Sequence, residues 1–271
     1  MDKQLQFKDL WAIILGGSGG FGYAAVQKLA RHGMNIALIY RENKSSDQAL
    51  KHDLDSLASE NHIRILPYNI NALDDDAREG FIADFSTHIS KGSVKLLLHS
   101  IARGNLKPLA IKDNPGEDQY NTLSVEDIKL TTYAMATSLL DWTRSILRSN
   151  LFNADARIIG LTSEGAHKFW ESYAAVSIAK ASLESLAKYM AVEFSPYGLK
   201  TNVIQAGVTE TASLKRIPGS DKLLEMSAKR NPMGRMTKPE DVAAVIYLLC
   251  SDEAFFINGS IIHADGGEHL R

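Results

Sequence analysis

The sequence has a single cysteine, Cys250, no long apolar run and almost no excess of either charge. One cysteine excludes a disulfide framework and is typical of a reducing compartment. The formal net charge is −2, from 30 Lys and Arg against 32 Asp and Glu, which argues against a nucleic-acid or anionic-membrane partner. The first apolar run, residues 11–15, is too short for a signal sequence or a membrane-spanning helix. We therefore expect a cytoplasmic protein with neither kind of partner.

Short apolar segments alternate along the chain with longer segments of helical periodicity. Segments this short and apolar are typical of strands buried on both faces of a parallel sheet. The candidate strands are residues 11–15, 35–40, 64–68, 94–100, 156–162, 200–205 and 260–264. The helical segments are residues 21–32, 46–59, 72–90, 124–149, 171–194 and 239–250. The pattern predicts an α/β fold: one doubly wound, Rossmann-like domain over residues 1–271, with a seven-stranded parallel sheet and helices on both faces.

One segment, residues 207–236, breaks this alternation directly after the sixth predicted strand. Ligands bind beyond the carboxyl ends of strands in open α/β sheets. An insertion at this point is therefore more typical of a helical substrate lid than of a separate domain. A surface excursion without function is the alternative.

A glycine-rich run, GGSGGFG at residues 16–22, lies between the first predicted strand and the first predicted helix. Glycine allows positive φ angles and lets the backbone come close to a pyrophosphate, and the N–H groups that begin the helix face its charge. The context of strand, loop, helix and second strand favours a dinucleotide-binding loop over a plain tight turn. The residues expected to contact the cofactor here are Gly16, Ser18, Gly20, Phe21 and Gly22.

The second predicted strand ends in Tyr40 and Arg41, followed by Glu42 and Lys44. An acidic residue at this strand end binds the ribose diol of NAD and repels a 2′-phosphate. A guanidinium instead pairs with such a phosphate through two hydrogen bonds. Arg41 therefore favours NADPH over NADH as the cofactor, although Glu42 is adjacent.

The spacing of Gly16, Gly20 and Gly22 resembles that of short-chain dehydrogenases/reductases, and the resemblance covers residues 10–268. The turn His-Ser-Ile-Ala that begins at His99 is similar to that of bacterial enoyl-acyl-carrier-protein reductases, and HADGG at residues 263–267 resembles the family's last strand and turn. The resemblance implies a homotetramer, and we expect no metal site. It also implies cofactor contacts from residues near the ends of the later strands and on the catalytic helix: Asn69, Ile70, Ser100, Ile101, Ala102, Lys180, Gly207, Thr209 and Thr211.

Most members of this family use Tyr-x3-Lys, but the residue four before Lys180 is Val176, which has no ionisable group. The nearest upstream phenol is Tyr173, and on one helix seven residues bring two side chains to the same face about 10 Å apart. This Tyr-x6-Lys spacing resembles that of enoyl reductases. The resemblance implies that Tyr173 donates to the oxygen on which negative charge develops, while Lys180 holds the ribose hydroxyl groups and lowers the pKa of the phenol.

Ser163 lies where ordinary family members keep a catalytic Ser and where most bacterial enoyl reductases carry a second Tyr. This combination resembles a minority type of bacterial enoyl reductase that uses NADPH. The leading hypothesis is NADPH-dependent reduction of the carbon–carbon double bond of an enoyl thioester on acyl carrier protein or CoA, in fatty acid synthesis. Tyr173, Lys180 and Ser163 are its catalytic residues. A carbonyl or 3-ketoacyl reductase is the alternative, and a catalytically silent NADPH-binding protein is the third reading.

Overall fold

In the residues that the structure describes, seven strands form one parallel sheet in the order β3-β2-β1-β4-β5-β6-β7. This computed structural model describes residues 6–110, 122–212, 214–217 and 219–271. The strands are β1 (Trp11–Leu15), β2 (Asn35–Tyr40), β3 (Ile65–Asn69), β4 (Val94–His99), β5 (Phe152–Ser163), β6 (Leu199–Ala206) and β7 (Ile261–Ala264). This order is that of a doubly wound, Rossmann-like sheet, so the predicted fold class is confirmed.

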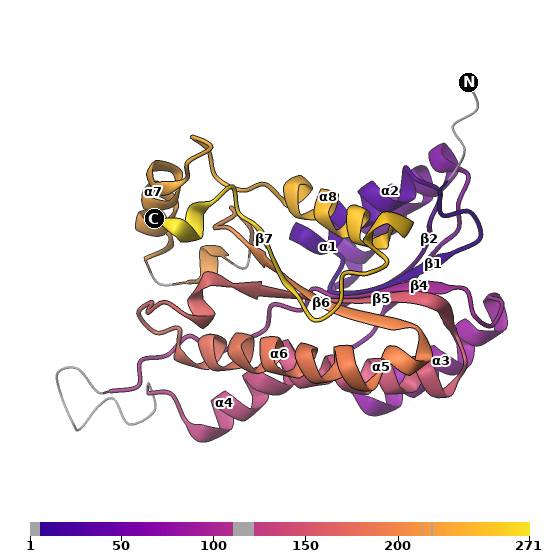
Figure 1. Ribbon diagram of the computed structural model, residues 1–271, viewed down its shortest axis with the longest axis horizontal. Helices are drawn as coiled ribbons and strands as arrows, with labels where there is room; N and C mark the ends of the chain where they lie inside the picture. The colour runs from indigo at the N-terminus through magenta and orange to yellow at the C-terminus, as the bar shows by residue number, and fades with distance from the viewer. Residues whose placement is uncertain (1–5, 111–121, 213, 218) are drawn as a thin grey trace.

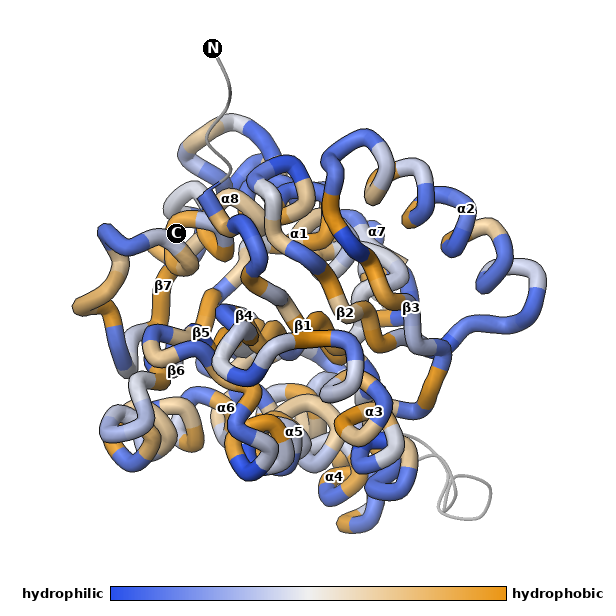
Figure 2. Tube along the Cα trace, turned by 90° about the vertical axis from the view of Figure 1, so that its right-hand side faces the viewer, coloured by the Kyte–Doolittle hydropathy of each residue, from blue (hydrophilic) through white to orange (hydrophobic). Residues whose placement is uncertain are grey.

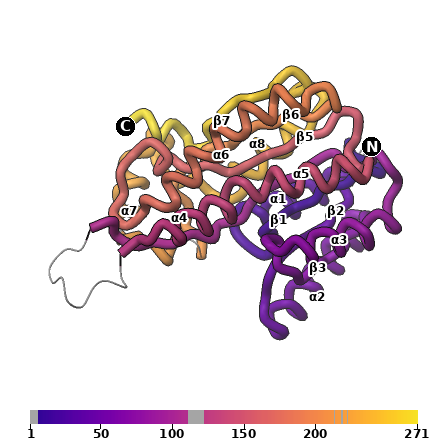
Figure 3. Tube along the Cα trace, turned by 90° about the horizontal axis from the view of Figure 1, so that it is seen from below, coloured from indigo at the N-terminus to yellow at the C-terminus, as the bar shows by residue number. Residues whose placement is uncertain are grey.

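Helices cover both faces of the sheet (Figure 1). One layer consists of α1 (Gly20–Ala30), α2 (Lys44–Asn61) and α8 (Pro239–Cys250). The other consists of α3 (Asp75–His88), α4 (Val125–Thr132), α5 (Ser138–Arg148) and α6 (Ala174–Glu193). Figure 2 shows the sheet between the two layers, and Figure 3 shows the second layer from below. Within the described ranges, no helix is long and apolar enough to cross a membrane.

The alternation of side chains along β1 explains how one strand holds both layers. Ala12 and Ile14 belong to the apolar cluster under α1 and α8, whereas Trp11, Ile13 and Leu15 belong to the cluster under α3, α5 and α6. All five side chains are buried. Each fully buried Ile or Leu contributes about 1.5–3 kcal/mol. The short apolar run is therefore a two-sided strand at the centre of the sheet.

The loops after β1 and β4 meet where the strand order reverses direction, which is where open α/β sheets form their ligand crevice. Gly16 has a φ of +83°, and a Cβ atom there would lie 2.6 Å from the carbonyl oxygen of Ser100. A Cβ atom on Gly22, in the first turn of α1, would lie 2.5 Å from the carbonyl oxygen of Gly16. Packing therefore requires glycine at both positions. These two glycines let the glycine run lie close to the loop after β4 and to the first turn of α1.

Two of the predicted helices differ from those observed in ways that bear on the site. The segment predicted as one helix over residues 124–149 is α4 and α5 joined by a π-helical turn, Tyr133–Thr137, a local widening that often accompanies functional sites. The helix predicted over residues 171–194 begins only at Ala174, because Ser172 has a positive φ of 60° and Tyr173 is the N-cap. Tyr173 and Lys180 therefore do not share two continuous helical turns, and that part of the prediction is wrong.

Candidate active site

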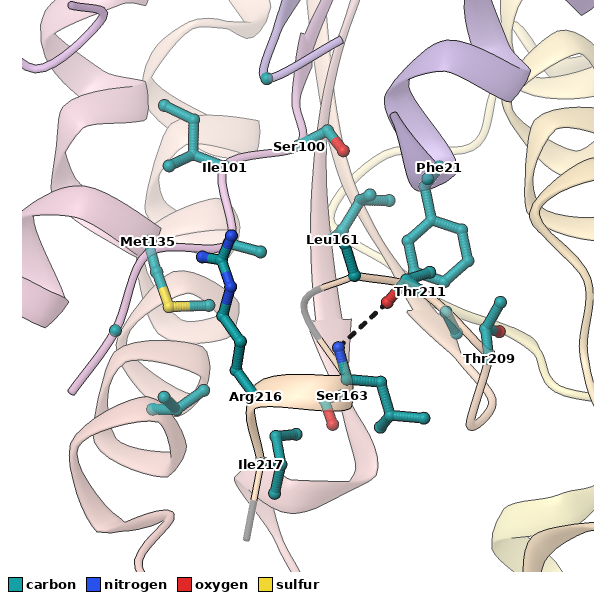
Figure 4. Close-up of a pocket in the computed structure, with 18 of the residues that line it drawn as sticks. Phe21, Ser100, Ile101, Met135, Leu161, Ser163, Thr209, Thr211, Arg216 and Ile217 are labelled. Atoms are coloured by element: carbon teal, nitrogen blue, oxygen red, sulfur yellow. Dashed lines mark hydrogen bonds between the residues drawn. The ribbon is translucent and has the colours of Figure 1, made fainter. Parts of the chain in front are cut away.

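A cavity of about 620 Å³ opens at the carboxyl ends of β1, β4, β5 and β6, a volume within the range of cofactor and small-molecule sites. Figure 4 shows Phe21 of α1, Ser100 and Ile101 after β4, and Thr209 and Thr211 after β6 around it. The predicted site residues that line the cavity are Gly16, Ser18, Gly20, Phe21, Arg41, Ser100, Ile101, Ala102, Ser163, Tyr173, Lys180, Gly207, Thr209 and Thr211.

Three predicted cofactor residues lie outside this lining. Gly22 packs against the backbone of the glycine run, and Ile70 packs against the core cluster under α3. The Asn69 side chain is engaged by the backbone of Glu42: its Oδ1 accepts from the Glu42 N–H at 2.9 Å, and its Nδ2 donates to the Glu42 carbonyl at 2.9 Å. A direct contact of these three residues with a cofactor stays a prediction.

Glu42 is a site residue that the sequence reasoning passed over in favour of Arg41. Its backbone is fixed by Asn69, and its carboxylate accepts a hydrogen bond of 2.9 Å from the Ser18 hydroxyl of the glycine run. A carboxylate is therefore held between the end of β2 and the glycine run, where a ribose diol would be recognised. The position of Glu42 one residue beyond Arg41 was the available signal, but only the tertiary contact with Ser18 shows that the Glu42 carboxylate reaches the glycine run.

The Tyr173 phenol lines the cavity from the residue that precedes α6. Burial raises the pKa of Tyr173, and a hydrogen bond with the Ser163 side chain opposes that rise. The phenol therefore stays neutral near pH 7 and can act as a hydrogen-bond donor. The lowering of the phenol pKa by Lys180 stays a prediction, because burial and Ser163 are the causes of the shift found at Tyr173.

Lys180 lies deeper, on α6, with only 7% of its surface exposed. Its Nζ donates a hydrogen bond of 2.6 Å to the carbonyl oxygen of Leu161 on β5. Burial lowers the pKa of Lys180 to about 8, and the negative charge of Glu184 opposes that change. His99 at the end of β4 is also buried; its pKa is lowered to about 3 by burial and by Lys180, so it is neutral. Lys180 is therefore a cation below about pH 8.

Part of the cavity lining is apolar, and we call it the apolar half. Its side chains come from the loop after β4, the π-helical turn, α6 and the segment 207–236: Ile101, Leu106, Met135, Val176, Leu214, Ile217 and Leu223. Arg216 extends from the short helix Leu214–Arg216 between Met135 and Leu161 in Figure 4, where the dashed line marks the bond from the Leu214 N–H to the Thr211 hydroxyl. This lining can accommodate a ligand that has an apolar tail and a polar group near Tyr173.

Comparison with known proteins gives the family. Residues 16–269 match the family described as Enoyl-(Acyl carrier protein) reductase. The chain belongs to this family. It is an NAD(P)H-dependent oxidoreductase of the short-chain dehydrogenase/reductase type, as its fold and motifs indicated. Across the described residues, no group of three or more His, Cys, Asp or Glu side chains is arranged to hold a metal ion.

Two sequence relatives and one crystal structure are representative. The enoyl-[acyl-carrier-protein] reductase [NADH] of Aquifex aeolicus is 34% identical over 179 residues, which are 66% of this chain and 63% of the relative. That of Escherichia coli is 27% identical over 247 residues, 90% of this chain and 87% of the relative. The crystal structure of the Aquifex aeolicus enzyme covers 98% of both chains, with 26% identity and a TM-score of 0.80.

The predicted preference for NADPH over NADH is wrong. Both sequence relatives carry NADH in their names. The structure supplies a physical reason, since the Glu42 carboxylate faces the glycine run through Ser18 and would repel a 2′-phosphate at this place. Arg41 lines the same cavity, but the Glu42 carboxylate and its negative charge remain beside the glycine run.

Proposed function

We propose that this protein is an enoyl-thioester reductase that uses NADH and takes its substrate on acyl carrier protein or CoA. The observation that carries the proposal is that the Tyr173 phenol and Ser163, which interact with each other, line the same cavity as the glycine run and the apolar half. The names of the relatives support the same substrate class. We treat residues 1–271 as one catalytic domain, with residues 207–236 as its lid, and expect it in the cytoplasm.

Tyr173, Ser163, Lys180 and the glycine run each have an assigned role in this reaction. A bound dinucleotide supplies a hydride for the β-carbon of the unsaturated thioester, while negative charge develops on the thioester oxygen. The neutral Tyr173 phenol donates a hydrogen bond to that oxygen, which stabilises the transition state more than the ground state. The Ser163 hydroxyl orients the phenol, and the Lys180 ammonium binds the ribose hydroxyl groups. The glycine run accommodates the diphosphate, because Gly19 has open space on its outer side.

Oxidation of NADH in the presence of crotonyl and acetoacetyl thioesters, measured side by side, tests the proposal. We expect turnover with the crotonyl thioester and little with the acetoacetyl thioester. Turnover with acetoacetyl thioester alone would make the protein a carbonyl reductase, for which Ser163 is the favourable observation. Binding of NADH without turnover of either substrate would make it a catalytically silent dinucleotide-binding protein.

The Glu42 carboxylate is expected to set the choice of cofactor. In Glu42→Ala the repulsion of a 2′-phosphate is removed and a hydrogen bond to the ribose is lost, each worth about 1–3 kcal/mol. The ratio of kcat/KM for NADH over NADPH should therefore fall at least about tenfold, measured by steady-state kinetics with both cofactors. Glu60→Ala, at an exposed position of α2, is the matched control. Equal effects on both cofactors would show that Glu42 does not recognise the ribose.

The protein is expected to form a homotetramer. Large apolar side chains on α4 and α6 are exposed in the single chain: Val125, Leu130, Ile178, Tyr189 and Val192. A second subunit would cover such faces. Light scattering at micromolar concentration should give a mass near four times 29.8 kDa, and a monomer would contradict the expectation.

The lid is expected to close in its first half only. The end of α7 (Ser220–Arg230) is already anchored: Arg230 Nη2 lies 2.8 Å from Glu268 Oε1 and also bonds Glu164, and the Ser227 hydroxyl donates to Glu268 at 2.7 Å. The first half lacks such buried ion pairs among its described residues, and its Leu214 and Leu223 line the apolar half. Ser213 and Pro218 lie outside the described residues.

Hydrogen exchange measures this closure. On binding of NADH together with an acyl ligand, exchange should slow sharply over residues 207–223, because closure buries that backbone. Residues 227–236 should be protected before ligands are added and change little. Slow, unchanging exchange over both halves would identify the segment as a fixed wall of the cavity.

A further inference from the structure

Lys180 shares its buried position with one carboxylate, Glu184, which lies one helical turn further along α6. Residues four apart on a helix face the same side, and Glu184 is only 4% exposed. Its negative charge acts on Lys180 and favours the charged ammonium. The other titratable group found to interact with Lys180, His99 on β4, is neutral. Glu184 is therefore the counter-charge of this ammonium among the described residues.

Both carboxylate oxygens of Glu184 are also engaged by polar side chains. Oε1 accepts a hydrogen bond of 2.6 Å from the Thr162 hydroxyl near the end of β5. Oε2 lies 2.8 Å from Nε2 of His167, which follows the short helix Glu164–Ala166 and is more than half exposed. A buried carboxylate requires such partners. Glu184 thus connects α6 to the chain on both sides of Ser163.

Three consecutive residues of β5 hold three polar side chains contributed by α6 and its N-cap. The Leu161 carbonyl accepts from Lys180, the Thr162 hydroxyl donates to Glu184, and the Ser163 side chain is hydrogen-bonded to Tyr173. The middle contact therefore lies between the two that involve the assigned catalytic residues. A carboxylate here fixes the geometry of the pair and also supplies charge.

We propose that Glu184 is a positioning residue of this site, whose carboxylate keeps Lys180 in its ammonium form and holds the end of β5 against α6. The proposal rests on the function proposed above, in which the Lys180 ammonium binds the ribose. Glutamine would keep the shape and a hydrogen-bond acceptor for Thr162, but it would remove the charge. The charge and the shape are therefore separable by Glu184→Gln.

Loss of the counter-charge should move the alkaline limit of activity to lower pH. A buried ammonium without a carboxylate nearby loses its proton more easily, so the pKa of Lys180 should fall below its value of about 8. A shift of one pH unit changes the ammonium fraction about tenfold above the pKa. In Glu184→Gln, kcat/KM at pH 8.5 should fall about tenfold or more against wild type, while the value at pH 6 changes less than about threefold.

The experiment records kcat/KM and the Kd of NADH between about pH 5.5 and 9.5 for wild type and three variants. Glu184→Asp retains the charge and should keep the alkaline limit nearer that of wild type. Glu193→Gln, at an exposed position of the same helix, should match wild type throughout. A loss in Glu184→Gln that is equal at every pH would overturn the proposal, because a purely structural role predicts that result.

A second measurement does not depend on the substrate and separates this proposal from the proposed function. The free energies of unfolding of Lys180→Met, Glu184→Gln and the double variant form a thermodynamic cycle. We expect the double variant to lose less stability than the sum of the single variants, because it contains no uncompensated charge. If Glu184→Gln alone does not fold, the double variant should. Additive losses, or a double variant that also fails to fold, would overturn the proposal even if enoyl thioesters are reduced.

Discussion

Replacing Tyr173 by Phe should lower kcat for an enoyl thioester by about 100-fold or more, because in the proposed function the neutral phenol donates to the developing enolate oxygen. Val176, four residues before Lys180, has no ionisable group and cannot replace it. Binding of NADH should change little, since the phenol is assigned to the substrate oxygen and the diphosphate is assigned to the glycine run. Steady-state kinetics and fluorescence titration with NADH measure the two effects separately.

The matched control is Tyr197→Phe, which removes an exposed phenol and should leave kcat unchanged. Ser163→Ala should have a smaller effect on kcat than Tyr173→Phe, because it removes the group that orients the phenol and leaves the donor. Near-normal turnover by Tyr173→Phe would refute the catalytic role of Tyr173. It would also direct attention to Ser163 as the donor.

The fold could be predicted from the sequence because its signals are local and strong. The strands over residues 11–15 and 35–40 are observed with those bounds, since each is an apolar run that must be buried on both faces. The strand predicted over residues 156–162 is observed as Phe152–Ser163. Its first half contains the polar residues Asn153 and Asp155, which interrupt the apolar run, so the sequence did not predict a strand there. That segment nevertheless pairs with β4 through Phe152.

Only those features of the site that depend on short sequence motifs could be predicted. Spacing made Tyr173 and Lys180 candidates, but their surroundings depend on contacts between segments far apart in the sequence. The direction of the Glu42 side chain is set by Ser18, 24 residues away. The environment of Lys180 is set by Glu184 and by a carbonyl of β5, 19 residues before it. Neither contact leaves a periodic or compositional signal, which is why the cofactor preference was wrong and Glu184 was not singled out.

The end of the sheet opposite the cavity contains a second cluster of charges, in which Lys95 and Arg157 are buried and Asp155 and Lys200 are half-buried. Asp155 of β5 accepts from Lys95 of β4 at 2.7 Å and from Lys200 of β6 at 2.6 Å, and it also pairs with the Arg157 guanidinium. Arg157 is fully buried and donates to the Leu249 carbonyl at 2.6 Å. One carboxylate therefore compensates three cations from three adjacent strands.

Asp155→Asn should destabilise the protein by about 3–5 kcal/mol, because it leaves buried cations without their counter-charge. Urea unfolding at pH 7 and fixed protein concentration measures the loss. Asp53→Asn on α2, where the side chain is exposed, should change stability by less than about 0.5 kcal/mol. Because the cluster lies far from the cavity, the KM for NADH should be unchanged at low temperature.

The pH dependence distinguishes lost charge from lost shape. Although burial opposes it, hydrogen bonds from Arg157, Lys200 and Lys95 hold the pKa of Asp155 well below its usual value of 3.8. A carboxylate with a lowered pKa stabilises the fold fully above the unfolded pKa, and this contribution is lost as the pH falls toward the folded pKa. The difference in unfolding free energy between wild type and Asp155→Asn should therefore be constant from about pH 5 to 8 and shrink below about pH 4. A difference that persists undiminished in acid would mean that the introduced amide disturbs packing and that charge compensation contributes little.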